Sequence, residues 1–181
     1  VERHTTMQAV FDYSWALLPS AEQQCLLQLS LFQADFQREA AFFVTEQALS
    51  PLISLCDRFL IQIKEPGWYA FHPLIRQFVT EKSASDVTID WHQSKARYMA
   101  YFLGHLGDLN QREQLQKAPV PALMSPLSRT YADIRQAWRW AVETEQISLL
   151  SKAWLSLDFY LEMAGDVSQK LSLFRWTEEQ L

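Results

Sequence analysis

The sequence is poor in the residues from which phosphate loops, metal sites and disulfide frameworks are built. It contains four Gly, and neither GxxxxGK[ST] nor GxGxxG occurs, so the chain itself carries no phosphate-cradling loop. None of its four His stands four residues from another, which excludes the paired spacing of a helical zinc motif. Two Cys are too few for a disulfide framework. We expect Cys25 and Cys56 to be free, buried thiols of a reduced cytoplasm.

Long apolar runs and an excess of positive charge are also absent. No uncharged apolar run approaches the ~18 residues that a transmembrane helix requires. Sixteen basic and 21 acidic residues give a net charge of −5, whereas a nucleic-acid-binding surface is basic. Apolar residues make up 49% of the chain, which is enough to bury a core. We therefore expect a cytoplasmic protein without membrane contact, and the charge argues against direct binding of nucleic acid.

Apolar residues recur every three or four positions along most of the chain, which predicts a mainly α-helical fold. Ser20 and Gln23 fit a capping box at the start of the second predicted helix. Gly165 is predicted to end the penultimate helix. Residues 107–126, with one Gly and three Pro, are predicted to form a long connection. The predicted helices cover residues 7–18, 20–31, 35–46, 47–57 and 73–83, and further helices are marked by Trp91, Tyr131, Leu150 and Leu171.

A change of period marks one β-hairpin in this helical sequence. Apolar residues alternate over residues 59–64, Pro66-Gly67 is a turn signal, and residues 68–72 form a second predicted strand. Helices followed by one hairpin suggest a winged-helix domain over residues 1–84. Residues 85–181 then suggest antiparallel helical hairpins of the tetratricopeptide type, although no clean 34-residue repeat is found. Val1 in place of Met and a helical C-terminus lead us to expect a piece of a longer protein.

One polar residue is singled out as a candidate for binding. His72 is predicted to end the second strand, immediately before a helix that begins at Pro73. A His beside the free N–H groups of a helix N-terminus can share an anion site with the helix dipole. The alternative is a His that only hydrogen-bonds the backbone at the turn, and the residues alone leave both open.

The remaining candidates are interpreted as structural. Five aromatic residues at helical spacing are assigned to a packing core. Asp133 and Arg135 are assigned to a polar helix face. Residues 48–58, the segment before the hairpin, contain one basic residue, which argues against a DNA-reading helix because each phosphate contact needs a cation. The aromatic set comprises Trp138, Trp140, Trp154, Phe159 and Tyr160.

Several segments, taken in order, carry a family resemblance. The opening Arg3-His4-Thr5-Thr6-Met7 is followed by Leu29-Ser30-Leu31-Phe32 and then by Tyr69-Ala70-Phe71-His72-Pro73-Leu74-Ile75-Arg76-Gln77-Phe78. Together they resemble the winged-helix domain that follows the nucleotide-binding core in STAND (NB-ARC-like) signal-transduction ATPases. Asp133-Ile134-Arg135-Gln136-Ala137-Trp138 resembles the start of the tetratricopeptide-like sensor region of the bacterial members, which include transcription regulators.

The resemblance implies a function for the chain and a role for one residue. His72 matches the motif His that faces the β-phosphate of bound ADP in the closed state, although Pro73 replaces the acidic residue that commonly follows it. The P-loop belongs upstream, so the chain would be a non-catalytic regulatory arm without a cofactor of its own, and ADP or ATP would bind the parent ATPase. Its partners would be the upstream NTPase domain and an inducer or protein on the helical array. The alternatives are a helical-repeat interaction scaffold and a DNA-binding winged helix.

Overall fold

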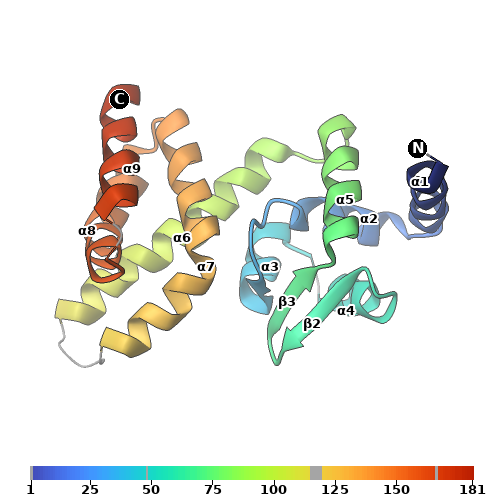
Figure 1. Cartoon of the computed structure of the whole chain (residues 1–181), viewed down its shortest axis with the longest axis horizontal. Helices are drawn as coiled ribbons and strands as arrows, with labels where there is room; N and C mark the ends of the chain where they lie inside the picture. Colours follow the sequence, from blue (N-terminus) through green and yellow to red (C-terminus); the bar gives the residue numbers. More distant parts are fainter. Residues whose placement is uncertain (1, 48, 115–119, 166) are drawn as a thin grey trace. The chain divides into compact units, whose positions relative to one another are not determined.

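The computed structural model describes the backbone of residues 2–47, 49–114, 120–165 and 167–181 (Figure 1). Side chains are described for residues 9–47, 49–109, 125–165 and 167–181. The predicted mainly helical fold is confirmed: these residues form nine α-helices and one small antiparallel sheet. None of these helices combines the length and the apolar character that crossing a bilayer requires. The chain divides into two compact units, Val1–Ser94 and Lys95–Leu181.

The first unit combines five complete helices with a three-stranded sheet. The sheet order is β1-β3-β2, and both pairings are antiparallel. Its elements are α1 (Glu2–Ala16), α2 (Ser20–Leu29), β1 (Phe36–Gln37), α3 (Arg38–Thr45), α4 (Leu49–Asp57), β2 (Ile61–Glu65), β3 (Trp68–Phe71) and α5 (Pro73–Ser85).

The predicted hairpin is present as β2 and β3, with Gly67 at φ +81° in the turn between them. The prediction of one isolated hairpin is incomplete, because β1 pairs with β3 through Phe36 and Tyr69. The helix predicted over residues 35–46 is correspondingly wrong at its start. A two-residue strand is too short to show an alternating pattern. Phe36 is instead held by aromatic packing, with its ring centroid 4.7 Å from that of Phe32.

The start of α2 differs from the predicted capping box. Pro19 is the N-cap residue and Ser20 is already helical, so no side chain caps the helix. The Gln23 side chain instead donates a 2.8 Å hydrogen bond to the carbonyl oxygen of Trp15. This bond ties the start of α2 to the end of α1, so a tertiary contact takes the place of the local cap.

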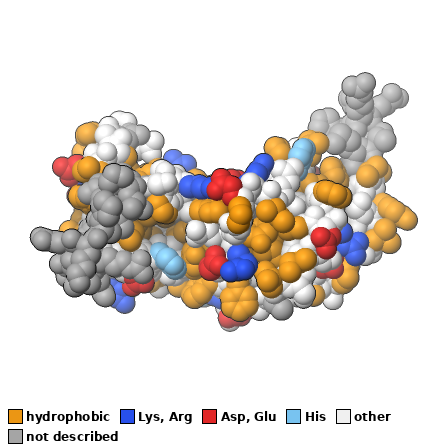
Figure 2. Space-filling model, turned by 90° about the horizontal axis from the view of Figure 1, so that it is seen from below, with side chains coloured by type: hydrophobic (Ala, Val, Ile, Leu, Met, Phe, Trp, Pro, Cys, Tyr) orange, Lys and Arg blue, Asp and Glu red, His pale blue; other side chains and the backbone are white. Residues whose placement is uncertain are grey.

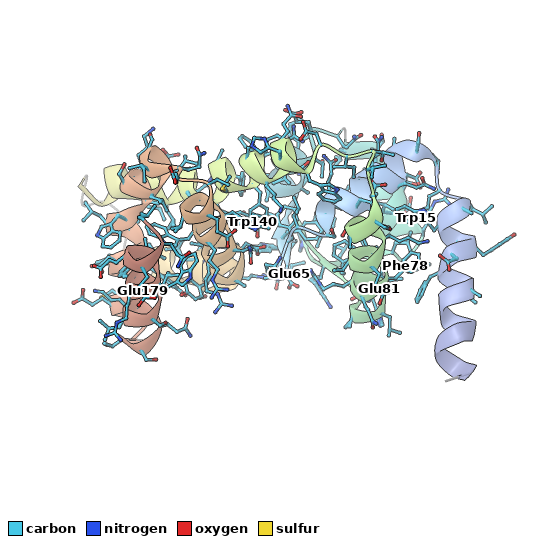
Figure 3. All side chains as sticks on the ribbon, turned by 90° about the horizontal axis from the view of Figure 1, so that it is seen from above. Trp15, Glu65, Phe78, Glu81, Trp140 and Glu179 are labelled. Carbon is cyan, nitrogen blue, oxygen red and sulfur yellow. The ribbon has the colours of Figure 1, made fainter. Side chains whose placement is uncertain are left out.

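Helix α1 packs against α5 through aromatic rings. The Phe78 ring centroid lies 5.4 Å from that of Phe11 and 6.1 Å from that of Trp15, and Figure 3 shows Trp15 and Phe78 between the two helices. Beside these rings, the Lys82 ammonium group forms an ion pair with the Asp12 carboxylate, with 2.7 Å between Nζ and Oδ1. The N-terminal helix is therefore joined to the sheet-containing part of the unit by an apolar seam.

Helix α2 carries the more deeply buried of two free cysteines. Cys25 is buried and Cys56 is half-buried, so the expectation of two free thiols is confirmed and full burial holds for Cys25 alone. Burial raises the pKa of the Cys25 thiol to about 12, and Glu22 and Cys56 add to this effect. Burial also raises the pKa of Cys56. A thiol that stays protonated in the fold is a poor nucleophile.

This shift predicts a loss of stability in alkali. Above the ordinary thiol pKa of 9.0 the unfolded chain releases the Cys25 proton, whereas the folded chain keeps it up to about pH 12. The folded state then binds more protons, so stability falls by about 1.4 kcal/mol per pH unit in this window. Urea unfolding of the wild type and of Cys25→Ala between pH 8 and pH 11 measures the difference. Parallel pH profiles of the two proteins would contradict the assignment.

A structured turn leads from α5 into α6 (Trp91–Gln114). The Asp86 carboxylate accepts hydrogen bonds from the backbone N–H groups of Thr88 and Ile89. In the first turn of α6, the buried Ser94 hydroxyl accepts a 3.0 Å hydrogen bond from the Gln28 amide. The first unit therefore reaches Ser94, and the predicted boundary between residues 84 and 85 lies ten residues before that point.

The second unit consists of the rest of α6 and three further helices: α7 (Val120–Glu143), α8 (Ile147–Met163) and α9 (Val167–Gln180). The predicted connection over residues 107–126 is wrong for the residues described. Helix α6 continues through Gly107, where an added Cβ would lie 3.4 Å from the Cβ of Lys152, so this Gly permits close packing of α6 against α8. Residues 115–119 lie outside the described residues. The predicted role of Gly165 at the end of α8 is confirmed by its φ of +72°.

Buried polar contacts join the helices of this unit. Asp133, predicted on a polar helix face, is fully buried, and its carboxylate accepts a 2.6 Å hydrogen bond from the Tyr98 hydroxyl. Trp138 donates a 2.9 Å hydrogen bond from its indole N–H to the Thr177 hydroxyl, which joins α7 to α9. Since buried polar groups require partners, these bonds fix the register in which the helices pack.

Candidate functional site

His72 occupies the single residue between strand β3 and helix α5. Phe71 before it is buried, and Ile75 on the first turn of α5 is buried as well, so the junction is anchored on both sides. His72 itself is exposed and is the N-cap residue of α5, with φ −65° and ψ 138°. Pro73 at the first helical position has the fixed φ that a helix start requires. These neighbours thus fix the backbone that carries the exposed imidazole.

The imidazole contacts the backbone through one of its two nitrogens. Its Nδ1 accepts a 3.3 Å hydrogen bond from the backbone N–H of Leu74. In the neutral ring this leaves the proton on Nε2, because one nitrogen donates while the other accepts. The backbone contact considered from the sequence therefore exists, and it leaves Nε2–H as a donor on an exposed side chain.

The electrostatics around His72 favour an anion. The N-terminus of a helix carries a partial positive charge, and the first turn of α5 contains no acidic residue. Arg76, one turn further along, donates a hydrogen bond to the carbonyl oxygen of Phe32, and its guanidinium carbon lies 5.0 Å from the centroid of the Phe71 ring. Its charge adds to the positive potential of this helix end while its side chain is fixed by the fold.

Pro73 reduces what the helix itself can offer to an anion. It has no backbone N–H, and the N–H of Leu74 already bonds His72. Two of the donors that a helix N-terminus normally presents are thus not free to bind an anion, one because it is absent and one because it is already bonded. An anion bound here would depend on the imidazole rather than on a ring of backbone donors.

The helices expected to carry the alternative DNA-reading function lack free cations in the part that the structure describes. Along α4 the exposed side chains include Leu49, Ile53 and Asp57 but no Lys or Arg. Arg58, just beyond it, lies 3.2 Å from the Glu22 carboxylate, and Arg38 on α3 pairs with Glu39. On the face shown in Figure 2, basic and acidic side chains lie next to one another. This arrangement argues against a phosphate-binding surface.

The other residues singled out in the sequence are mostly structural. Trp138 and Tyr160 are buried, as expected of a packing core, while Trp154 is partly exposed and stacks on Phe174 with ring centroids 4.2 Å apart. Among the residues described, no group of three or more His, Cys, Asp and Glu side chains could hold a metal ion.

One surface feature was not singled out from the sequence. Arg139 of α7 lies over the Trp176 ring of α9, with its guanidinium carbon 5.7 Å from the ring centroid, and Arg135 lies one turn before it. Two Arg four residues apart could have been noted in the sequence. Their neighbour Trp176 becomes visible only when α7 and α9 are packed together.

Comparison with known proteins gave one structural neighbour. No protein-family model and no curated protein matches the chain. The chain is similar to the crystal structure of a Signal Transduction ATPase with Numerous Domains (STAND) protein with a tetratricopeptide repeat sensor from Pyrococcus horikoshii. The sequence identity is 20% and the TM-score is 0.45. The match covers 96% of this chain and 32% of that protein, so the chain spans about a third of its length.

Proposed function

We propose that this chain is the non-catalytic regulatory arm of a STAND-type ATPase switch in the cytoplasm. The first unit would be the winged-helix domain that packs on the nucleotide-binding core. The second would be the start of a tetratricopeptide-like array that receives an inducer or protein partner. The nucleotide, ADP or ATP, would bind in the parent protein between the core and the winged helix.

The order of elements supports the winged-helix assignment. A helix, a short strand and two helices (α2, β1, α3 and α4) precede the hairpin of β2 and β3, and the sheet order is β1-β3-β2. In the second unit, α7 packs against both α8 and α9, so helices two apart in sequence are in contact. Contacts between helices two apart in sequence are typical of arrays of helical repeats.

One observation carries the proposal. The motif residue His72 is exposed at the N-terminus of α5, and the contact of its Nδ1 with Leu74 leaves Nε2–H to donate. We infer that Nε2–H donates to the β-phosphate of ADP and so stabilises the closed, resting state. Inducer binding would favour the open, ATP-bound state, by no more than its difference in affinity for the two states.

Substitution of His72 in the parent ATPase tests the function. Losing a hydrogen bond to a charged group costs about 1.5–3 kcal/mol, so His72→Ala is expected to raise activity without inducer by about tenfold or more. The readout is the output activity of the parent protein with and without its inducer.

Two further variants separate phosphate binding from helix capping. Asp is a strong N-cap residue, so His72→Asp keeps α5 stable while it removes the donor and adds repulsion toward phosphate. His72→Asp is expected to raise the activity without inducer at least as much as His72→Ala does. Glu81→Ala, on the exposed side of the same helix, is expected to leave the switch unchanged. If His72→Asp retained full dependence on inducer, the proposed role of His72 would be wrong.

A further inference from the structure

Most arginines with described side chains are engaged by a partner. Arg38 and Arg58 form ion pairs, and Arg76 donates to a backbone carbonyl. Arg97 and Arg129 are also engaged. The exceptions within the described residues are all on α7 and α9: Arg135 and Arg175 make no hydrogen bond or ion pair, and Arg139 makes only its contact with a ring. Unused guanidinium groups are thus gathered on one pair of packed helices.

The packing of α7 on α9 gives two of these arginines a fixed setting. Arg135 and Arg139 are exposed and four residues apart, which places their Cβ atoms about 5–6 Å from each other on one helix face. Trp138, between them in sequence, is buried and bonds Thr177, so α7 is held in register against α9. Trp176 next to Thr177 is half-buried and presents its ring to Arg139.

This setting suits a carboxylate. A guanidinium that lies over an aromatic ring keeps the N–H groups at its edge free, and these match the two oxygens of a carboxylate. A second guanidinium one turn away can hold a second carboxylate, while the exposed part of Trp176 offers apolar contact. The unit as a whole is not basic, because residues 95–181 contain ten basic and ten acidic residues. A nucleic acid would need a wider positive field than this.

We propose that Arg135, Arg139 and Trp176 form a docking surface for an acidic segment of a partner protein. Each guanidinium binds a carboxylate, and an apolar side chain of the segment packs on Trp176. The inference rests on the proposed function in one respect, namely that the helical array is the part that receives a partner. It adds the chemistry of that partner and the position at which it binds.

Binding of a model peptide to the whole 181-residue chain tests the surface. The probe is a short fluorescent peptide of repeated Glu-Glu-Leu, and the matched control peptide repeats Gln-Gln-Leu. Fluorescence anisotropy is measured for the wild type and for Arg135→Gln/Arg139→Gln at low salt. We expect the acidic peptide to bind the wild type at least tenfold more tightly than it binds the double variant, and the Gln peptide to bind neither. Both substituted side chains are exposed, so the fold is retained, as circular dichroism will verify.

A second double variant controls for net charge. Arg38→Gln/Lys64→Gln removes the same charge from the first unit and is expected to bind the acidic peptide as the wild type does. Equal loss in both double variants, equal binding of the Gln peptide, or no binding of the acidic peptide would each overturn the proposal. Equal competition by a single-stranded oligonucleotide would also overturn it, in favour of a general anion surface. Peptide binding is measured independently of ADP retention, so the docking proposal can fail while the proposed switch function holds.

Discussion

Replacing Trp138 with alanine is expected to lower the free energy of unfolding of the Lys95–Leu181 unit by about 3–5 kcal/mol. The side chain is fully buried, and its ring centroid lies 5.9 Å from that of Trp154 and 6.1 Å from that of Phe174. Alanine would leave a cavity between α7, α8 and α9 and would remove the hydrogen bond to Thr177. The measurement is urea unfolding followed by circular dichroism.

Two variants separate the contributions to this loss. Trp138→Phe keeps most of the apolar volume but removes the indole donor. It is expected to cost about 1–3 kcal/mol, for the lost hydrogen bond and the lost part of the ring, because the Thr177 hydroxyl still donates to the carbonyl oxygen of Leu173. Leu155→Ala is the surface control, because Leu155 on α8 is 65% exposed. It is expected to change stability by less than about 0.5 kcal/mol. A Trp138→Ala protein as stable as Leu155→Ala would contradict the packing of this unit.

Replacing Phe36 with alanine is expected to lower the free energy of unfolding of the Val1–Ser94 unit, also by about 3–5 kcal/mol. Phe36 is 1% exposed and stacks on Phe32. Its ring centroid lies 6.2 Å from that of Phe71. Since it also pairs with Tyr69 of β3, its loss removes the anchor of the third strand. Chemical denaturation measures the loss, provided that the unfolding signal of the first unit is separated from that of the second.

The control for Phe36 lies in the same sheet. Ile63 on β2 also pairs with Tyr69 but is 63% exposed, so Ile63→Ala is expected to cost less than about 1 kcal/mol. Similar losses in the two variants would mean that Phe36 is not a core residue and that β1 contributes nothing to the sheet.

The sequence predicted those elements whose signal is local and strong. The hairpin followed from a change of period and from Pro66-Gly67, whose backbone preferences fit a turn. Most helices followed from apolar spacing, which reports directly on the buried face. Gly107 and Pro126 suggested a break, yet both lie within helices. At Gly107 the close approach of Lys152 on α8 outweighs the local propensity of glycine.

The features that were missed depend on tertiary contacts. Strand β1 has two residues, and its place is set by Phe36 packing on Phe32, which no pattern along the chain reports. Asp133 was assigned to a polar face but is buried, and Tyr98 on α6 supplies the donor that makes its burial possible. Ser20 has the sequence of a cap but is not one, because the chain enters α2 through Pro19.

The candidate site was predictable in position but not in detail. The spacing of strand and helix placed His72 at a junction, and the structure places it there as the N-cap of α5. Which ring nitrogen contacts the backbone could not be known without the geometry of Leu74. The role of His72 toward a nucleotide rests on the resemblance of its motif, and it stays a prediction.

The rate of ADP dissociation from the parent ATPase measures whether His72 holds the resting state. We expect His72→Ala to release ADP about 10- to 150-fold faster than the wild type, the change that corresponds to about 1.5–3 kcal/mol. The ADP-loaded protein is chased with excess unlabelled nucleotide, and release of a fluorescent ADP analogue is followed over time. An unchanged rate in His72→Ala, with α5 still folded, would contradict the claim that this residue holds the resting state.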